Sequence, residues 1–234
     1  MQTLAKHAAI IVAAGKGKRM ASPVRKQYLE ISGRPILYWT LKRFQDFPDI
    51  KEIVLVVPEN DLKTLYPMVT GQWQMTKVIK LVAGGKERHD SVYKGLRALS
   101  QDIELVLIHD GVRPFVSDAM LERVIEAAAE QKAAVVGVPP KDTIKRVEHN
   151  MITETLSREH LVQVQTPQVF RYDVIMQAFE YAFTHQRFST DDTALVENIG
   201  ISVKVVMGDY ENIKITSKED MLLAEQIHKR WVPK

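Results

Sequence analysis

Residues 8–14 have the sequence AAIIVAA, and the glycine turn Gly15-Lys16-Gly17 follows them directly. A short, almost continuous apolar run of this kind is typical of a strand that is covered on both faces of its sheet. Similar runs recur along the chain at residues 52–57, 78–83, 104–109 and 133–138. Amphipathic stretches separate these runs, so the sequence predicts an α/β fold with a doubly wound, mostly parallel sheet.

The stretch 118–131 shows the helical pattern clearly. Ser117 or Asp118 is a suitable N-cap residue, and apolar side chains recur at helical spacing from Met120 to Ala128. Further helices are predicted at residues 36–47, 61–70, 90–100, 172–185, 191–198 and 217–231, with one more strand at 202–207. Because no linker divides the chain, residues 1–234 are expected to form one domain.

Residues 139–170 break the alternation of strands and helices. They begin with Pro139-Pro140 and contain short strand-like pieces at 143–147, 152–156 and 161–165, without a helical period. Loops of this length are uncommon in compact domains, so the pattern favours a projecting β-arm. An irregular surface loop is the alternative.

The composition excludes several classes of protein. The chain has 234 residues, of which 45% are hydrophobic and 26% charged, so it can form a stable core without disulfides or structural metals. It has no cysteine, which rules out disulfides, a thiolate nucleophile, cysteine-ligated zinc and iron–sulfur clusters. The net charge of +3 is too small to indicate nucleic-acid binding.

The sequence gives no sign of a membrane protein. No segment approaches the ~18 consecutive apolar residues of a transmembrane helix. The apolar run near the N-terminus ends in Gly15-Lys16-Gly17-Lys18-Arg19 and not in a small-residue cleavage site, which argues against a signal peptide. We therefore expect a cytoplasmic protein.

The turn after the first predicted strand could bind an anion. Its two glycines allow backbone N–H groups to approach a phosphate closely. The segment does not match the P-loop pattern, which needs Gly at position 12 and Ser or Thr at 19, where this chain has Val12 and Arg19. It does not match the dinucleotide pattern either, which needs Gly or Ala in place of Met20. It is nevertheless dense in cations, which suits a polyphosphate: Lys16, Lys18, Arg19, Arg25 and Lys26. A solvated basic loop is the alternative.

A second group of polar residues follows the predicted strand at 104–109. The sequence His109-Asp110-Gly111-Val112-Arg113 should emerge beside the Gly15 turn, because ligands of parallel sheets bind beyond the carboxyl ends of the strands. Asp110 is a suitable ligand for Mg²⁺, which prefers one or two carboxylates together with phosphate oxygens. An Asp that caps the turn is the alternative, and His109 is interpreted as a structural residue.

Three more segments combine turns with polar residues. GGKERHDS at 84–91 is another glycine turn before a helix, and Thr190-Asp191-Asp192 could bind a ligand or cap a helix. Residues 212–216 resemble a short strand that presents Lys214, which could also be an ordinary surface lysine.

Taken in order, these segments resemble one family. AAGKGKRM with Lys26-Gln27-Tyr28, GGKERHDSV, HDGVRPF, VPPKDTIKRV, QTPQVF, TDD and ENIKITSKED are similar to the 2-C-methyl-D-erythritol 4-phosphate cytidylyltransferases, from about residue 8 to 226. The resemblance implies a Rossmann-like fold of the nucleotide-diphospho-sugar transferase type and a homodimer held by the β-arm. It also implies CTP and methylerythritol phosphate as substrates and Mg²⁺ as the cofactor.

The resemblance assigns roles to individual residues. It implies catalytic roles for Arg19, Lys26, Arg158 and Lys214, and a contact between Asp110 and the metal. It implies nucleotide contacts at Ala13, Ala14, Gly15, Lys16, Gly17, Gly85, Arg88, Ser91, Asp110 and Gly111. It implies contacts with the sugar phosphate at Arg113, Thr143, Thr166 and Thr190, with the arm reaching into the partner subunit's site.

The implied reaction is attack of the methylerythritol phosphate on the α-phosphorus of CTP. Such a transfer needs positioning and charge stabilisation and little covalent chemistry, which fits a chain without an evident nucleophile. Two alternatives stay open. A ribitol-5-phosphate cytidylyltransferase would share the fold and the donor, and a non-catalytic nucleotide-binding protein could have retained the fold alone.

Overall fold

A mixed sheet forms the centre of the protein, whose computed structural model describes residues 6–15 and 25–231. The sheet has the strand order β11-β7-β10-β6-β1-β4-β5. Only β10 is antiparallel to its neighbours. The strands are β1 (His7–Val12), β4 (Ile50–Val57), β5 (Val78–Ala83), β6 (Leu105–Asp110), β7 (Ala133–Val138), β10 (Gln163–Arg171) and β11 (Lys204–Met207). The predicted α/β fold with a mainly parallel sheet is confirmed.

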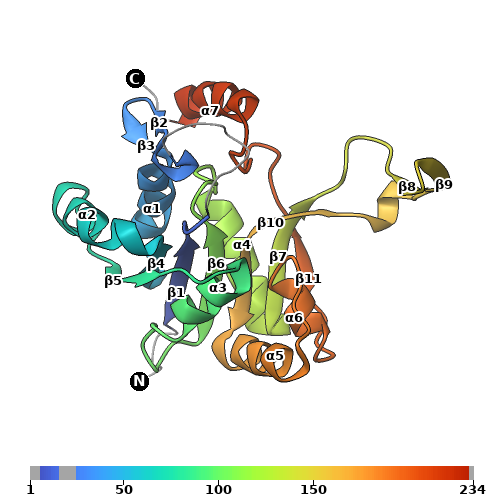
Figure 1. Ribbon diagram of the computed structural model, residues 1–234, viewed down its shortest axis with the longest axis horizontal. Helices are drawn as coiled ribbons and strands as arrows, with labels where there is room; N and C mark the ends of the chain where they lie inside the picture. The colour runs from blue at the N-terminus through green and yellow to red at the C-terminus, as the bar shows by residue number, and fades with distance from the viewer. Residues whose placement is uncertain (1–5, 16–24, 232–234) are drawn as a thin grey trace.

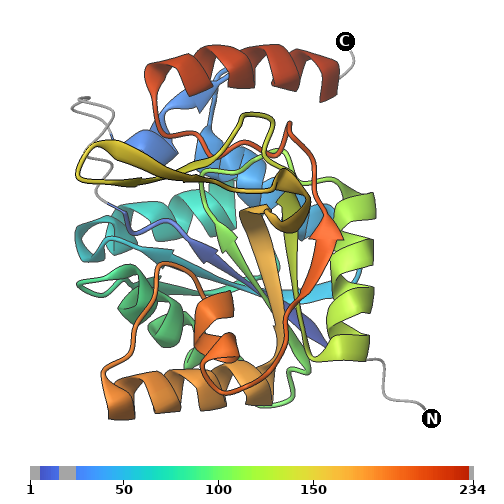
Figure 2. The ribbon, with the colours of Figure 1, turned by 90° about the vertical axis from the view of Figure 1, so that its right-hand side faces the viewer.

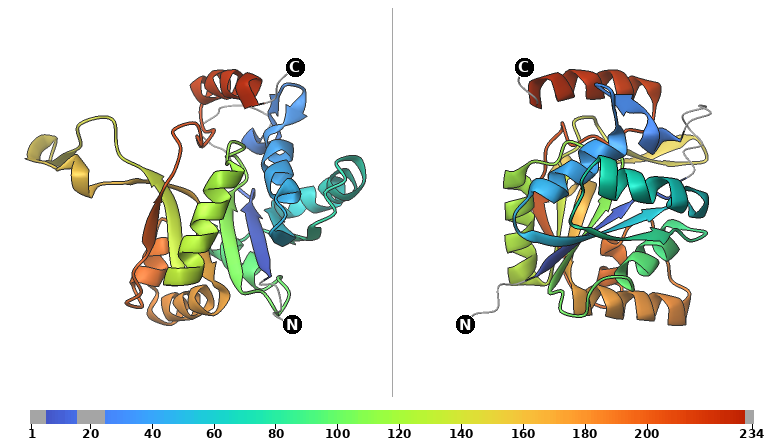
Figure 3. Two further views of the ribbon diagram at one scale, coloured as in Figure 1. Left: turned by 180° about the vertical axis from the view of Figure 1, so that it is seen from behind. Right: turned by 90° about the vertical axis from the view of Figure 1, so that its left-hand side faces the viewer.

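Helices cover both faces of this sheet (Figures 1 and 3). One face packs against α1 (Ile36–Asp46), α2 (Leu62–Pro67) and α4 (Asp118–Gln131). The other packs against α3 (Arg88–Leu96), α5 (Tyr172–His185) and α6 (Thr193–Glu197). The apolar run at residues 8–14 packs against both layers of helices, since Ala9 and Ile11 belong to the first core and Ala8 and Ile10 to the second. This explains why the run is apolar throughout and does not alternate.

A third, smaller core lies beside the main sheet. The last helix, α7 (Lys218–Trp231), runs along the top of the molecule next to the hairpin of β2 (Glu30–Ile31) and β3 (Arg34–Pro35) (Figure 2). Ile31, Val112, Ile215 and Ile227 are buried together there. This core therefore joins the loop after β6 to the segment before α7.

The predicted arm projects from the body as a hairpin (Figure 1). β8 (Lys145–Glu148) and β9 (Met151–Thr155) form a separate two-stranded sheet, and every residue in these strands is exposed. The predicted range of 139–170 is too long, however. Residues 163–170 belong to β10, which is paired with β6 and β7 on its two sides and is buried from Gln165 to Phe170.

Several other predicted boundaries are wrong for local reasons. The helix expected at 61–70 is a 3₁₀ turn at Glu59–Asp61, then α2, then a wider π turn at Met68–Gln72. Pro67, which has no amide hydrogen to donate, stands where α2 ends and the π turn begins. The helix expected at 191–198 begins only at Thr193. Residues 212–216 form no strand. By contrast, α4 has its predicted bounds, and the Ser117 hydroxyl caps it by accepting from the Met120 N–H.

Candidate active site

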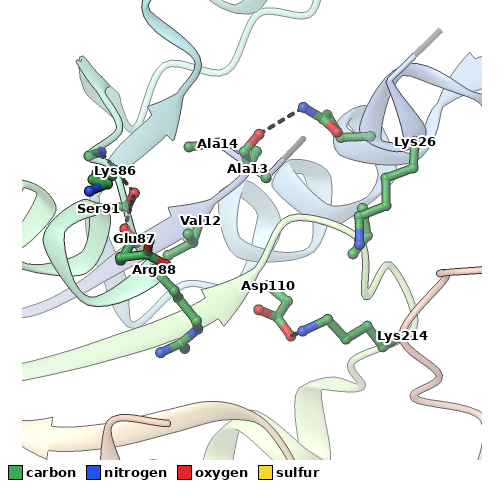
Figure 4. Close-up of a pocket in the computed structure, with 14 residues that line it drawn as sticks. Val12, Ala13, Ala14, Lys26, Lys86, Glu87, Arg88, Ser91, Asp110 and Lys214 are labelled. Atoms are coloured by element: carbon green, nitrogen blue, oxygen red, sulfur yellow. Dashed lines mark hydrogen bonds and ion pairs between the residues drawn. The ribbon is translucent and has the colours of Figure 1, made fainter. Parts of the chain in front are cut away.

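A cavity of about 500 Å³ lies at the carboxyl ends of β1 and β6. This is the point at which the strand order reverses, since β1 pairs with β4 on one side and β6 on the other. Its walls come from segments within 12–15, 26–27 and 85–91, and from Asp110, Val112 and Lys214 (Figure 4). The two polar groups that the sequence placed at neighbouring strand ends therefore share one cavity.

The backbone after β1 is held tightly at the floor of this cavity. The Ala13 N–H donates to the Val56 carbonyl at 2.7 Å, and the Ala13 carbonyl accepts from the buried Gln27 side chain at 2.8 Å. Ala14 lies against Gly84, where an added Cβ would come within 2.4 Å of the Ala14 Cβ. The small residues at 13 and 14 and the facing glycine thus allow neighbouring strand ends to come close together.

Lys26 lines the cavity from a short 3₁₀ helix, Lys26–Tyr28. Both ends of this helix are tied to Asp61. Arg25 forms an ion pair with the Asp61 carboxylate, and the Tyr28 hydroxyl donates to it at 2.6 Å. Gln27, between Lys26 and Tyr28, donates to Ala13 as described above. Lys26 therefore projects from a segment that is fixed on both sides.

The start of α3 forms the opposite wall. A capping box joins Glu87 and Asp90, so the first turn of the helix is well satisfied. The Gly85 N–H donates to the Ser91 hydroxyl at 3.0 Å, and that hydroxyl donates to the Glu87 carbonyl at 3.1 Å. Gly85 and Ser91 thus lie together on the cavity wall.

Arg88 is held by a buried carboxylate from a distant part of the chain. Its guanidinium pairs with Asp192 at 2.7 Å, and Asp192 is only 1% exposed. The Asp192 N–H donates to the Gln168 side chain at 3.0 Å, which fixes the carboxylate's own backbone. The aspartates around Arg88 outweigh the effect of burial and raise its pKa, so it stays a cation.

Asp110 lies among three cations. Its carboxylate pairs with Lys214 at 2.8 Å and with Arg113 at 3.5 Å. Burial alone would raise the pKa of Asp110, but the charges of Lys214, Arg88 and Arg113 outweigh it and hold that pKa well below its ordinary value. Asp110 is therefore ionised at any physiological pH.

A second cavity of about 480 Å³ adjoins the first. Arg88, Asp110 and Lys214 line both cavities, so these charged groups form their common wall. Arg113, Thr166 and Thr190 line the second cavity only. Five of the implied nucleotide contacts line the first cavity only: Ala13, Ala14, Gly15, Gly85 and Ser91. These two groups of residues thus face two adjoining spaces.

Some predicted residues lie elsewhere. Thr143 is exposed in the segment before β8. Arg158 lines a different cavity at the base of the arm and donates to the Lys141 carbonyl at 2.8 Å. Gly111 lines neither of the two cavities, and its N–H donates to the Val12 carbonyl at 2.9 Å. Lys16, Gly17 and Arg19 lie outside the described residues.

The site also depends on residues for which the sequence predicted no role. Gln27 was visible as part of the Lys26-Gln27-Tyr28 motif, and Asp192 as a carboxylate near a helix start. No local pattern reveals that each fixes another part of the site. His109, interpreted from the sequence as structural, is fully buried, and burial lowers its pKa to about 4.

A doubly wound sheet with adjoining cavities at its switch point, and with cations grouped around the ionised Asp110 in their common wall, defines an enzyme of the nucleotidyltransferase type. A family model described as 2-C-methyl-D-erythritol 4-phosphate cytidylyltransferase matches residues 7–230. The chain belongs to this family.

Individual relatives agree over almost the whole chain. A protein named 2-C-methyl-D-erythritol 4-phosphate cytidylyltransferase from Clostridium botulinum (strain Langeland) is 48% identical, covering 96% of this chain and 98% of its own. One of the same name from Geotalea uraniireducens is 50% identical over 93% and 94%. The crystal structure of 4-diphosphocytidyl-2C-methyl-D-erythritol synthase from Anaerococcus prevotii has a TM-score of 0.85, with 34% identity over 97% of each chain.

Within the described ranges, 6–15 and 25–231, no helix combines the length and the apolar character that crossing a bilayer would need.

Proposed function

We propose that the chain transfers the cytidylyl group of CTP to 2-C-methyl-D-erythritol 4-phosphate. A phosphate oxygen of the sugar phosphate forms a new bond to the α-phosphorus of CTP, and the bond from that phosphorus to the bridging oxygen of the β-phosphate breaks. The products are 4-diphosphocytidyl-2-C-methyl-D-erythritol and pyrophosphate. No general base is needed, because the attacking phosphate is already ionised. Since both substrates are water-soluble phosphates, we place the reaction in the cytoplasm.

The observation that carries this proposal is the charged wall between the two cavities. The two substrates are both anions and repel each other, so their reacting atoms meet only if cations lie between and around them. Arg88 and Lys214 line both cavities and are kept in place by Asp192 and Asp110. Lys26 adds a cation on the nucleotide side. Fixed charges of this kind stabilise the growing negative charge of the transition state without reorganising.

Asp110 could hold Mg²⁺ only together with the nucleotide. It is a single ionised carboxylate, and the described ranges contain no cluster of three or more potential protein ligands. Magnesium is commonly held by one or two carboxylates, substrate phosphates and water, so this donor set fits the ion. When bound, Mg²⁺ would withdraw charge from the triphosphate and stabilise the leaving pyrophosphate.

Arg158 belongs to the proposed site only if a second subunit supplies it. In its own chain it lies at the base of the arm and lines neither of the two adjoining cavities. The exposed apolar side chains Val147, Met151 and Ile152 on the arm support a homodimer that buries them. In that dimer the arm of one subunit would bring Arg158 to the sugar phosphate of the other.

A pyrophosphate-release assay with CTP and Mg²⁺ tests the reaction. We expect turnover with methylerythritol phosphate, whereas turnover with ribitol 5-phosphate alone would refute the assigned acceptor. Calorimetric binding of CTP without turnover of either acceptor would favour the non-catalytic alternative.

Subunit mixing tests the role of Arg158. Lys26→Ala and Arg158→Ala should each have strongly reduced activity alone, and mixing them should restore activity in heterodimers that contain one intact site. Arg146→Ala, which breaks an exposed ion pair with Glu154 in the same arm, is the matched control and should stay active. A mixture without restored activity would place Arg158 in the site of its own chain.

A further inference from the structure

A closed ring of hydrogen bonds surrounds the backbone of Asp110. The His109 ring faces the Arg113 carbonyl through Nε2 at 2.9 Å and the Thr166 hydroxyl through Nδ1 at 3.1 Å. The Arg113 guanidinium donates to the Asn212 carbonyl at 2.7 Å, and the Asn212 amide donates to the Thr166 carbonyl at 2.9 Å. The ring therefore joins β6, the loop after it, β10 and the segment before α7.

The direction of each proton in the ring follows from its partners. The Arg113 carbonyl can only accept, so Nε2 of His109 carries the ring hydrogen. His109 is fully buried and packs against the ring of Phe44, an environment that favours the neutral imidazole. Nδ1 of His109 is then an acceptor, and the Thr166 hydroxyl must donate to it.

This direction decides what Thr166 can do. Its oxygen also accepts the Asp110 N–H at 3.1 Å, so the hydroxyl proton and one lone pair are both in use. The hydroxyl has a single proton, and none remains for a substrate phosphate, which can only accept. Although Thr166 lines the second cavity, its hydroxyl is directed at the protein.

The same ring fixes Lys214. Asn212 is fully buried and lies two residues before Lys214, and the Ile215 N–H donates to the Val112 carbonyl at 3.0 Å. The lysine is thus held between two anchored neighbours, one of which belongs to the ring. Asp110 and Lys214, which pair at 2.8 Å, take their positions from the same set of hydrogen bonds.

We infer that His109 is a positioning residue, which acts through Thr166 on the backbone of Asp110 and through the ring on the segment that carries Lys214. Thr166 shares this positioning role and does not donate to a substrate phosphate. The effect on catalysis rests on the proposed function, whereas the tautomer and the ring do not. The ring holds Asp110 and Lys214 in a fixed geometry, which matters because displacements of about 1 Å can reduce a rate by about 10²-fold.

The tautomer can be tested without any substrate. In protein with ¹⁵N-labelled histidine, a two-bond ¹⁵N–¹H correlation spectrum distinguishes a protonated from an unprotonated ring nitrogen. The signals missing in His109→Asn identify His109. We expect a hydrogen on Nε2 and none on Nδ1 at pH 7. A hydrogen on Nδ1 would overturn the proposed direction and leave the Thr166 proton free for a ligand.

Kinetics test the positioning role. His109→Leu removes the acceptor, and Thr166→Val removes the hydroxyl at nearly constant shape. We expect each to lower kcat about tenfold or more, with the KM for methylerythritol phosphate changed less than twofold. Because both variants break the hydrogen bond between His109 and Thr166, their effects should not be independent, and the double variant should lose less activity than the product of the two single losses. Thr166→Ser keeps the hydroxyl and should lose less activity than Thr166→Val.

Other outcomes would overturn the inference. A raised KM for the sugar phosphate in Thr166→Val alone, with multiplicative losses in the double variant, would make Thr166 a direct substrate contact. Wild-type kcat in both single variants would reduce His109 to a residue that fills the core. If His109→Leu does not fold, the comparison of Thr166→Val with Thr166→Ser decides the question. A wild-type protein without turnover would instead refute the proposed function, while the spectrum would still test the ring.

Discussion

Acidification should destabilise the wild-type protein more than a variant without His109. Burial lowers the pKa of His109 to about 4, whereas an exposed imidazole in the unfolded chain has its ordinary value of 6.5. Between these two values the unfolded state binds a proton that the folded state does not, so stability falls as the pH falls. With those pKa values, the loss between pH 7 and pH 5 is about 2 kcal/mol, and it ends near pH 4.

Urea unfolding followed by tryptophan fluorescence measures this loss, since Trp39 and Trp73 lie in or against the cores. For a urea dependence of about 3 kcal/mol per M, the unfolding midpoint of wild-type protein should fall by about 0.6 M more than that of His109→Asn from pH 7 to pH 5. His149→Asn is the matched control. His149 is exposed in the turn between β8 and β9, at a backbone conformation that asparagine adopts readily, so this variant should follow the wild type.

The comparison of wild type with His109→Asn removes the contribution of the other titrating groups, because both proteins contain them. Equal shifts of the midpoint in wild type and His109→Asn would refute the reasoning. Such a result would mean that the folded protein protonates His109 as readily as the unfolded chain does, and that the burial of the ring has no electrostatic consequence.

Two further predictions concern the walls of the first cavity. Lys26→Ala should lower kcat by about 10²-fold or more, since its charge acts on the transition state, and the exposed Lys63→Ala should not; near-normal kcat in Lys26→Ala would contradict the assigned role. Gly84→Ala should lower the free energy of unfolding by about 1–3 kcal/mol, because its Cβ would lie 2.4 Å from that of Ala14. Gly71→Ala, where an added Cβ meets nothing within 4 Å, is the matched control in the same urea titration, and an equal effect of both substitutions would exclude the close contact as the cause.

The fold could be predicted from the sequence wherever burial and local preference agree. β5, β7, α4 and α5 have the bounds that their apolar patterns indicate. The prediction failed for β10, whose residues 163–170 were assigned to the arm. A strand that is antiparallel within a parallel sheet has no special local pattern, and its place is decided by its pairing with β6 and β7. Pairing partners far apart in the chain leave no trace in a short window of sequence.

The candidate site could be predicted in part, through the residues that carry charge at the ends of strands. Lys26, Arg88, Asp110 and Lys214 all line the first cavity. The groups that hold these charges were harder to predict. Asp192 is close in sequence to Thr190, yet its partner Arg88 is 104 positions away, and only the packing of α3 against the loop before α6 brings the two together.

Lys214 shows why the supporting groups matter as much as the charges. On sequence alone it could be any surface lysine, and it lies on no strand or helix that would direct it. Its direction comes from Asn212 on one side, bonded to β10, and from Ile215 on the other, bonded to the loop after β6. Because β6 also carries Asp110, the lysine and the carboxylate are both positioned by β6 and its neighbours, and their ion pair stays at 2.8 Å. A cation fixed in this way needs little reorganisation when a substrate arrives, and that is the property that lets it stabilise a short-lived distribution of charge.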